Sequence, residues 1–286
     1  MIVIVGFLVV IGGILAGFLW AGGSIPALIH PSEIVTIGGA VMGAMIVMSP
    51  KKVLMDLMAA VIGSLKGTPF NKAAYEEMFK CLYDLFRVAR REGLIALEQH
   101  VSNAHESELF KKYPKIHGNH HVCEFVCGAL SPIIEGTVKP EQLPGLLEGE
   151  IKVLEGEHHA AISVLAKTAD ALPGFGIVAA VLGIVITMGA INGPVDEIGE
   201  KVGAALVGTF IGILASYGFI QPLAAKMQAN IDEDGKFLKV IKAALIAYAK
   251  DCSPKVCVEF ARRSIAPSVR PTFEEVDQAT SNAGKS

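Results

Sequence analysis

Residues 171–190 read ALPGFGIVAAVLGIVITMGA and contain no charged side chain. At 1.5 Å per residue, about 20 residues of α-helix span about 30 Å, the thickness of the hydrocarbon core of a bilayer. Pro173 lacks a backbone N–H, so the carbonyl of Ala169 loses its helical partner, and Asp170 lies next to that carbonyl in the chain. We interpret the stretch as a membrane span whose entrance opens a polar pathway. The alternative is an ordinary helix start, where proline and acidic residues are common.

The composition favours a membrane protein. The chain is 52% hydrophobic and holds 30 glycines, and its mean hydropathy is +0.50, well above the values typical of soluble enzymes. The net charge of −3 argues neither for nor against nucleic acid. Five cysteines are an odd number and give no sign of a disulfide framework.

Three further apolar stretches complete the predicted set of spans, at residues 2–20, 34–48 and 202–220. No Lys or Arg precedes the first stretch, so we expect a retained helix rather than a secretory signal. The second is short for a span, but pairing with the first as a hairpin favours one. Residues 191–200 are predicted to form the turn between the third and fourth spans, and Pro222 to end the fourth.

The basic residues predict the orientation. Residues 51–170 hold 14 of the 25 lysines and arginines and residues 226–286 hold 10, whereas the loops between paired spans hold only Lys201. By the positive-inside rule, both termini and the middle segment are cytoplasmic. We therefore predict an all-α membrane protein with four transmembrane helices in two hairpins, a helical cytoplasmic domain between spans 2 and 3, and a cytoplasmic C-terminal tail. The predicted divisions are a hairpin at 1–50, the cytoplasmic domain at 51–170, a hairpin at 171–222, and a C-terminal helix and tail at 223–286.

Small residues four apart occur in every span, which allows helix backbones to approach closely. These contacts either stay within one subunit or join neighbouring chains, and four short spans make a thin bundle, so we favour an oligomer. The pairs are Gly13 and Gly17, Gly39 and Gly43, Gly176 and Ala180, and Gly208 and Gly212.

The middle segment is predicted to be helical. A stripe of apolar side chains from Leu147 to Leu165 leads without a break to Pro173, so the third span is expected to end a long helix. On an unbroken helix, Arg90 and Glu98 would lie about 80° apart in azimuth and about 12 Å apart along the axis. Such separated charges suit a partner of complementary charge, with an ordinary solvated face as the alternative. A further stripe comprises Tyr75, Met78, Phe79, Leu82, Leu85, Phe86 and Ala89.

Polar groups are scarce inside the predicted spans. No span contains a central Asp, Glu, Lys or Arg, and Thr209 is the clearest polar side chain of the fourth. A lone membrane threonine commonly bonds its own backbone, but it also suits an ion path. Because a proton carrier usually needs a titratable group, a proton path here requires a carboxylate from another chain.

One pattern resembles a metal site. His120, Cys123 and Cys127 share a helical face and are acceptable zinc ligands, but no fourth ligand is near. Buried cysteines that pack as small apolar residues are the alternative, and we expect neither a metal nor a cofactor. The sequence shows no nucleotide-binding motif, and we do not expect an enzyme.

Four motifs occur together: LPGFGIVAAVLGIV at 172–185, VGTFIGILASYGFIQP at 207–222, ARREGLIALE at 89–98 and VRPTFEE at 269–275. They resemble the MotA family of flagellar motor stator subunits, relatives of the TolQ and ExbB energising proteins, and the resemblance covers nearly the whole chain. It implies a homopentamer in the bacterial inner membrane around two copies of MotB, which supply a proton-accepting aspartate and a peptidoglycan anchor. It implies torque on the rotor protein FliG and no contact with nucleic acid.

The resemblance also assigns roles to residues. Arg90 and Glu98 match the charged residues that engage the rotor, and Arg91 extends the basic side. Pro173 and Pro222 match prolines beside the channel, Thr209 matches a channel-lining threonine, and Asp170 an acid at the channel's inner end.

The coupling ion is predicted to be the proton. Sodium needs several oxygen ligands, whereas a proton needs a carboxylate and a hydroxyl or water relay. Sodium-driven relatives that resemble this family carry threonine at the position of Ala180, so Thr209 lacks that companion here. The alternatives to a stator are a TolQ/ExbB-type energiser of an outer-membrane system, which has three spans, and a passive membrane scaffold.

Overall fold

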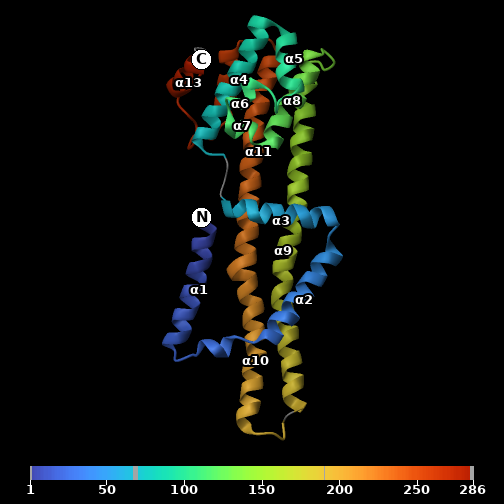
Figure 1. The fold of residues 1–286 in the computed structure, drawn as a ribbon, viewed down its shortest axis with the longest axis vertical. Coiled ribbons are helices and arrows are strands. Elements are labelled where there is room, and N and C mark those ends of the chain that lie inside the picture. The colour runs from blue at the N-terminus through green and yellow to red at the C-terminus, as the bar shows by residue number, and fades with distance from the viewer. Residues whose placement is uncertain (1, 67–69, 190, 284–286) are drawn as a thin grey trace. The chain divides into compact units, whose positions relative to one another are not determined.

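The computed structural model describes residues 2–66, 70–189 and 191–283, and the regular elements in these ranges are all helices (Figure 1). This confirms the all-α prediction for the described residues. The chain divides into two compact units: residues 1–67 and 156–230 form unit 1, and residues 68–155 and 231–286 form unit 2.

Unit 1 holds the apolar helices. It comprises α1 (Ile2–Trp20), the 3-10 turn η1 (Ile25–Leu28), α2 (Pro31–Met48), α3 (Lys51–Lys66), the end of α9 (Leu143–Gly189), α10 (Val195–Ile213), the π-helical segment η2 (Leu214–Ile220) and the start of α11 (Gln221–Ala249).

Four helical stretches are long and apolar enough to cross a membrane: Ile2–Trp20, Ile25–Met48, Leu143–Gly189 and Val195–Ala249. The first agrees with the predicted span at both ends. The 47-residue helix α9 confirms the prediction that the third span is the last part of a long helix. Pro173 lies inside α9 and does not interrupt it.

One predicted boundary is wrong, and another lies within a continuous helix. The turn at 191–200 is shorter, because α10 begins at Val195 and places Asp196 and Glu197 in its first turn, where acidic side chains complement the helix dipole. Helical structure continues past Pro222 through α11 to Ala249. Pro222 follows the π-helical segment, where the backbone hydrogen bonding has already changed from the α pattern.

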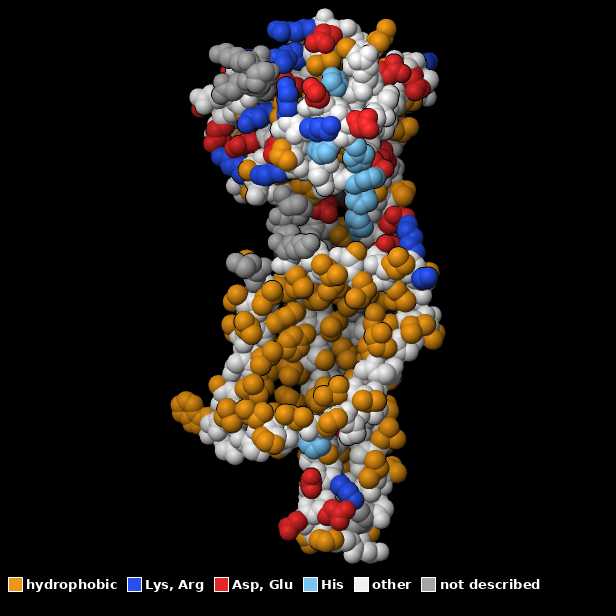
Figure 2. Space-filling view, viewed as in Figure 1, with side chains coloured by type: hydrophobic (Ala, Val, Ile, Leu, Met, Phe, Trp, Pro, Cys, Tyr) orange, Lys and Arg blue, Asp and Glu red, His pale blue; other side chains and the backbone are white. Residues whose placement is uncertain are grey.

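The surface of unit 1 is hydrophobic. Helix α1 has no buried residue, and Leu8, Val9 and Trp20 are among its exposed side chains. Figure 2 shows hydrophobic side chains over most of the visible surface of these helices. A surface of this kind requires lipid or other chains against it. On its inner side, α1 contacts η2 through Phe7 and Phe219, whose ring centroids are 5.0 Å apart.

Unit 2 is a helical body with its own core. It comprises α4 (Lys72–Glu92), α5 (Leu94–Ser102), α6 (Glu108–Lys111), α7 (Pro114–His117), α8 (His120–Ile134), the start of α9, the rest of α11, α12 (Pro254–Arg263) and α13 (Phe273–Ala283).

The predicted apolar stripe of α4 is confirmed, since all seven of its residues are buried. Phe237 of α11 lies at the centre of this core, fully buried, with its ring stacked on Phe70 at 4.2 Å and tilted against Tyr75 at 5.0 Å. The buried carboxylate of Asp84 accepts a hydrogen bond of 2.6 Å from the Tyr113 hydroxyl. Burial of its apolar stripe is what packs α4 into the core of unit 2.

The C-terminal helices are tied to α4 and to each other by charge. Thr272 and Glu275 form a capping box at the start of α13, because the Thr272 hydroxyl accepts from the Glu275 N–H and the Glu275 carboxylate accepts from the Thr272 N–H. Glu275 also pairs with Lys72 at 2.7 Å. In α12, hydrogen bonds from Arg262 and Arg263 lower the pKa of Glu259 to about 2, so its carboxylate stays ionised at neutral pH.

Candidate functional site

The helices α9 and α10 of unit 1 touch through glycine. A Cβ atom added to Gly176 would lie 2.9 Å from the carbonyl oxygen of Gly208, and one added to Gly212 would lie 2.7 Å from the carbonyl oxygen of Leu172. Real Cβ atoms do not approach backbone so closely, so this contact requires glycine. The predicted close approach is confirmed for these three glycines, and the contact fixes the geometry of the neighbouring polar groups.

The glycines of the first hairpin differ. A Cβ added to any of them would meet no atom of this chain within 4 Å, so they make no close approach within the chain as described. Contact with neighbouring chains stays a prediction for these four residues: Gly13, Gly17, Gly39 and Gly43.

The carbonyl freed by Pro173 has a partner on the facing segment. The Ser216 hydroxyl in η2 donates a 2.6 Å hydrogen bond to the Ala169 carbonyl, and Ser216 is completely buried. In an apolar environment this bond satisfies a group that would otherwise cost free energy. The sequence predicted the freed carbonyl but not Ser216 as its partner, although a hydroxyl inside an apolar span was a signal for such a role.

Asp170 is held one residue farther along. The Gln221 side-chain amide donates to the Asp170 carboxylate at 3.2 Å. Asp170 is otherwise exposed, and Pro222 directly follows Gln221. Two hydrogen bonds, Ser216–Ala169 and Gln221–Asp170, therefore join α9 to the η2–α11 segment. They bring the part of α9 that holds Asp170 and Pro173 close to the part of α11 that holds Pro222.

Thr209 and Ala180 lie at the glycine contact. The Thr209 Cα is 3.3 Å from the position of a Cβ at Gly176, and the Ala180 backbone nitrogen is 3.5 Å from the position of one at Gly208. Three other helical threonines, Thr36, Thr168 and Thr187, each donate to the carbonyl four residues earlier. Among the described residues the Thr209 hydroxyl has no such hydrogen bond, so it does not show the behaviour expected of a purely structural threonine.

Glu33 is a second carboxylate near the glycine contact, and the sequence did not identify it as a candidate. Because α2 begins at Pro31 rather than at residue 34, Glu33 lies in its first turn and is only 7% exposed. Its Oε2 atom lies 2.9 Å from the position of a Cβ at Gly208, beside Ala179. The predicted span at 34–48 left Glu33 outside it, and the Pro31 helix-start signal was the feature that could have included it.

The charged residues predicted to face a rotor lie at a corner in unit 2. Gly93 adopts a φ of +91° and separates α4 from α5, so the geometry calculated for an unbroken helix does not apply. Arg91 and Glu98 are exposed, and within the described residues neither has an ion-pair partner. Leu97, between them, is fully buried and anchors α5 to the core.

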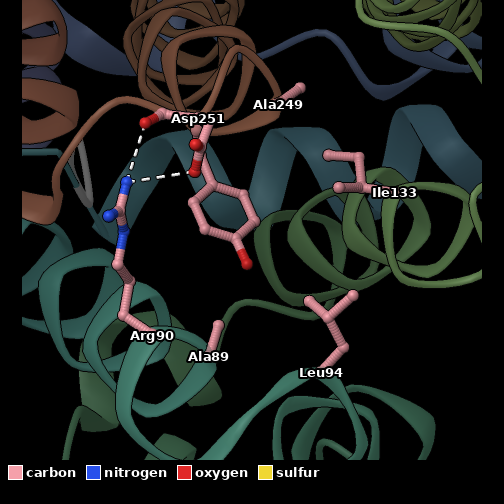
Figure 3. Close-up of a pocket in the computed structure, with 7 residues that line it drawn as sticks. Ala89, Arg90, Leu94, Ile133, Ala249 and Asp251 are labelled. Carbon is pink, nitrogen blue, oxygen red and sulfur yellow. Dashed lines mark hydrogen bonds and ion pairs between the residues drawn. The ribbon is translucent and has the colours of Figure 1, made fainter.

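Arg90 is different because it is engaged within the chain. Its Nη2 atom donates to the Asp251 backbone carbonyl at 2.7 Å and to the Asp251 carboxylate at 3.0 Å (Figure 3). The pair borders a cavity of about 300 Å³, and burial raises the pKa of Tyr248 in its wall. The remaining lining residues are Ala89, Leu94, Ile133 and Ala249.

The possible metal ligands are not brought together. Within the described residues no three His, Cys, Asp or Glu side chains form a group that could hold a metal ion. His120 instead lies 2.9 Å from Glu124, and Cys123 is buried.

The hydrogen bond between Ser216 and Ala169 leads to a prediction. Ser216→Ala should leave the Ala169 carbonyl unpaired and destabilise the chain by about 1–3 kcal/mol. Pro173→Ala restores an N–H that can bond Ala169, so adding Ser216→Ala to it should cost much less. Thermal melting of the purified complex measures both effects, and Thr187→Val, which removes a hydroxyl bonded only within its own helix, serves as the control. Equal costs of Ser216→Ala in the two backgrounds would contradict this account.

Comparison with known proteins agrees with these features. Residues 4–93 match the family model of the Motility protein A N-terminal region, and residues 102–238 match that of the MotA/TolQ/ExbB proton channel family. The chain is 36% identical over 278 residues to Motility protein A of Salmonella typhimurium, covering 97% of this chain and 94% of the relative.

Solved structures share the fold. A structure of C. jejuni MotAB aligns with a TM-score of 0.76 at 22% identity, covering 94% of this chain and 98% of the other. The flagellar MotAB stator complex of Bacillus subtilis aligns with a TM-score of 0.73 at 21% identity, covering 96% and 98%. The close relative and the two family models together show that this chain belongs to the MotA/TolQ/ExbB proton channel family, in its Motility protein A branch.

Proposed function

We propose that this chain, a proton-channel subunit of the flagellar stator and a multi-pass protein of the inner membrane, forms one wall of the proton path with the glycine contact of α9 and α10. The observation that carries this proposal is a row of polar groups along α9. The Thr209 hydroxyl, which has no hydrogen bond within the described residues, lies at the glycine contact with α10, and the Ser216–Ala169 and Asp170–Gln221 bonds join α9 to η2 and to the start of α11. The match to the N-terminal model of Motility protein A favours this function over a TolQ/ExbB-type energiser or a passive scaffold.

The carboxylate that receives the proton comes from MotB, the partner in the stator complex. Glu33 lies beside Gly208 and Asp170 lies beside Gln221, which are separated by about 20 Å along the helix axis. Between these levels the contact offers the hydroxyls of Thr209 and Ser216, which relay protons but do not store charge. A titratable group on MotB therefore completes the path.

Motion follows from the charge of that carboxylate. An ionised carboxylate in an apolar environment is costly, so protonation changes which surroundings it prefers and moves the subunits relative to MotB. The membrane potential supplies about 2.3 kcal/mol per charge per 100 mV. Asp170 and Pro173 form the inner end of the path, and Pro222 keeps Gln221 against Asp170. Five copies of the chain surround two copies of MotB in lipid, and both termini are cytoplasmic. The chain is divided as the sequence predicts, into a hairpin at 1–50, a cytoplasmic domain at 51–170, a hairpin at 171–222 and a C-terminal helix and tail at 223–286.

Arg90, Arg91 and Glu98 form the face that contacts the rotor protein FliG. Their support is the exposure of Arg91 and Glu98 at the rigid corner of α4 and α5, where Leu97 fixes α5. Opposite charges on one exposed corner recognise a partner by charge complementarity.

Charge reversal tests this face. Arg90→Glu should impair swimming while membrane insertion and complex assembly stay normal, because the residue is outside the apolar helices. A compensating reversal on FliG should restore part of the swimming speed. Normal swimming after reversal of both Arg90 and Glu98 would remove this face from the mechanism.

The coupling ion is tested separately. With alanine at position 180, Thr209 has no second hydroxyl beside it at the contact, so we expect proton coupling. Tethered-cell rotation at fixed membrane potential should be unchanged when external sodium is replaced by potassium, and Ala180→Ser serves as the variant with an added oxygen. Rotation that stops without sodium would overturn the proton assignment.

A further inference from the structure

Asp251 adopts a backbone conformation that normally selects glycine. It follows α11 with a φ of +62° and is the one non-glycine residue with positive φ among those described. Its N–H donates to the Tyr248 carbonyl at 2.9 Å, and the N–H of Cys252 donates to the Ala247 carbonyl at 3.1 Å. These two bonds form a Schellman motif, in which the residue with positive φ is usually glycine because a side chain is strained there.

The side chain of Asp251 has a contact that glycine could not make. Its carboxylate accepts from Arg90 Nη2, and the same nitrogen reaches the Asp251 carbonyl. Figure 3 shows Arg90 extending from α4 toward the end of α11, with the dashed contacts on one nitrogen. The end of α11 is fixed at this point because Tyr248 stacks on Phe86 of α4, with ring centroids 4.5 Å apart and planes 10° from parallel.

The Arg90 guanidinium is only partly used. Within the described residues its hydrogen bonds involve Nη2 alone, and the side chain is 45% exposed, while that of Asp251 is 95% exposed. A guanidinium has five N–H donors, so the Nε and Nη1 donors can still bind a carboxylate. An ion pair as exposed as this one is weak, so an incoming carboxylate can share or displace it.

We propose that Asp251 is an intramolecular counter-ion of the rotor face, which competes with a carboxylate of the rotor for Arg90 and thereby sets the affinity of that face. This inference rests on the proposed contact between Arg90 and FliG. Asp251 lowers the net positive charge of the corner and thereby weakens the attraction of an acidic rotor residue to Arg90. A carboxylate of the rotor must therefore displace Asp251 from Arg90 before it interacts with the full positive charge of Arg90.

Two substitutions separate charge from backbone geometry. Asp251→Gly removes the carboxylate and fits the positive φ, so the chain should melt at the same or a higher temperature than the wild type. Asp251→Asn keeps a side-chain oxygen and tolerates this φ, but it loses the charge. Both variants should bind purified FliG about 2- to 5-fold more tightly at low salt, when measured on the full chain with MotB in lipid nanodiscs. The gain should disappear at high salt, because exposed charges are screened there.

The background of Arg90→Ala decides the assignment. In that background Asp251→Gly should no longer strengthen the binding of FliG, because the competing pair is gone. Weaker or unchanged binding by both Asp251 variants would overturn the inference, as would an equal gain with and without Arg90. If Arg90→Ala itself leaves FliG binding unchanged, the proposed rotor contact fails, and that result is distinguishable because it does not depend on Asp251.

Discussion

Replacing Gly212 with alanine is expected to abolish motility. The added methyl group would lie 2.7 Å from the Leu172 carbonyl oxygen and 2.8 Å from the Gly176 Cα. Both are backbone atoms, so no rotation of a side chain relieves the clash, and α9 and α10 must separate. Overpacking of this kind costs about 1–3 kcal/mol or more, and the separation would also break the Ser216–Ala169 bond. Swimming in soft agar measures the loss of motility, and the yield of purified complex with MotB measures the destabilisation.

Gly203→Ala is the matched control. Gly203 lies on the same helix, and an added Cβ there would meet no atom of the chain within 4 Å. This variant should assemble and swim normally. Normal motility of Gly212→Ala would show that the glycine contact is not required for the proton path.

Replacing Phe237 with alanine is expected to destabilise unit 2 by about 3–5 kcal/mol, because it removes a fully buried ring and leaves a cavity. The ring also stacks on Phe70, a contact that alanine cannot replace. Limited proteolysis and thermal melting of the full chain with MotB should show early loss of this unit. Phe260→Ala, at a side chain that is 54% exposed in α12, should change neither. Equal resistance of the two variants would contradict the position of Phe237 in the core.

Local patterns predicted the elements that depend on one helix. The apolar stretch gave the bounds of α1, and helical periodicity identified the buried face of α4, because both depend on residues close in sequence. Pro173 marked the freed carbonyl for the same reason, since the missing N–H and the carbonyl lie on one turn.

Contacts between distant segments were not predictable in this way. Ser216 reaches Ala169 and Gln221 reaches Asp170 only because α9 and the η2–α11 segment are adjacent in space. The partnership of Asp251 with Arg90 depends on where α11 ends against α4. Periodicity gives the face of a helix but not the residue opposite it, so the sequence identified several site residues without their partners.

The π-helical segment η2 has a consequence for the alignment of the fourth span. Gly208, Gly212 and Ser216 recur every four residues and contact α9 in turn, but the next contact is made by Gln221, five residues on. The Gln221 N–H bonds the Ser216 carbonyl, also five residues back, so the wider turn absorbs one extra residue. Each residue of an α-helix rotates by about 100°, so a continuous α-helix would point Gln221 away from Asp170. The extra residue thus rotates Gln221 back toward Asp170. A chain with a regular α-helix here would need its partner for Asp170 at position 220.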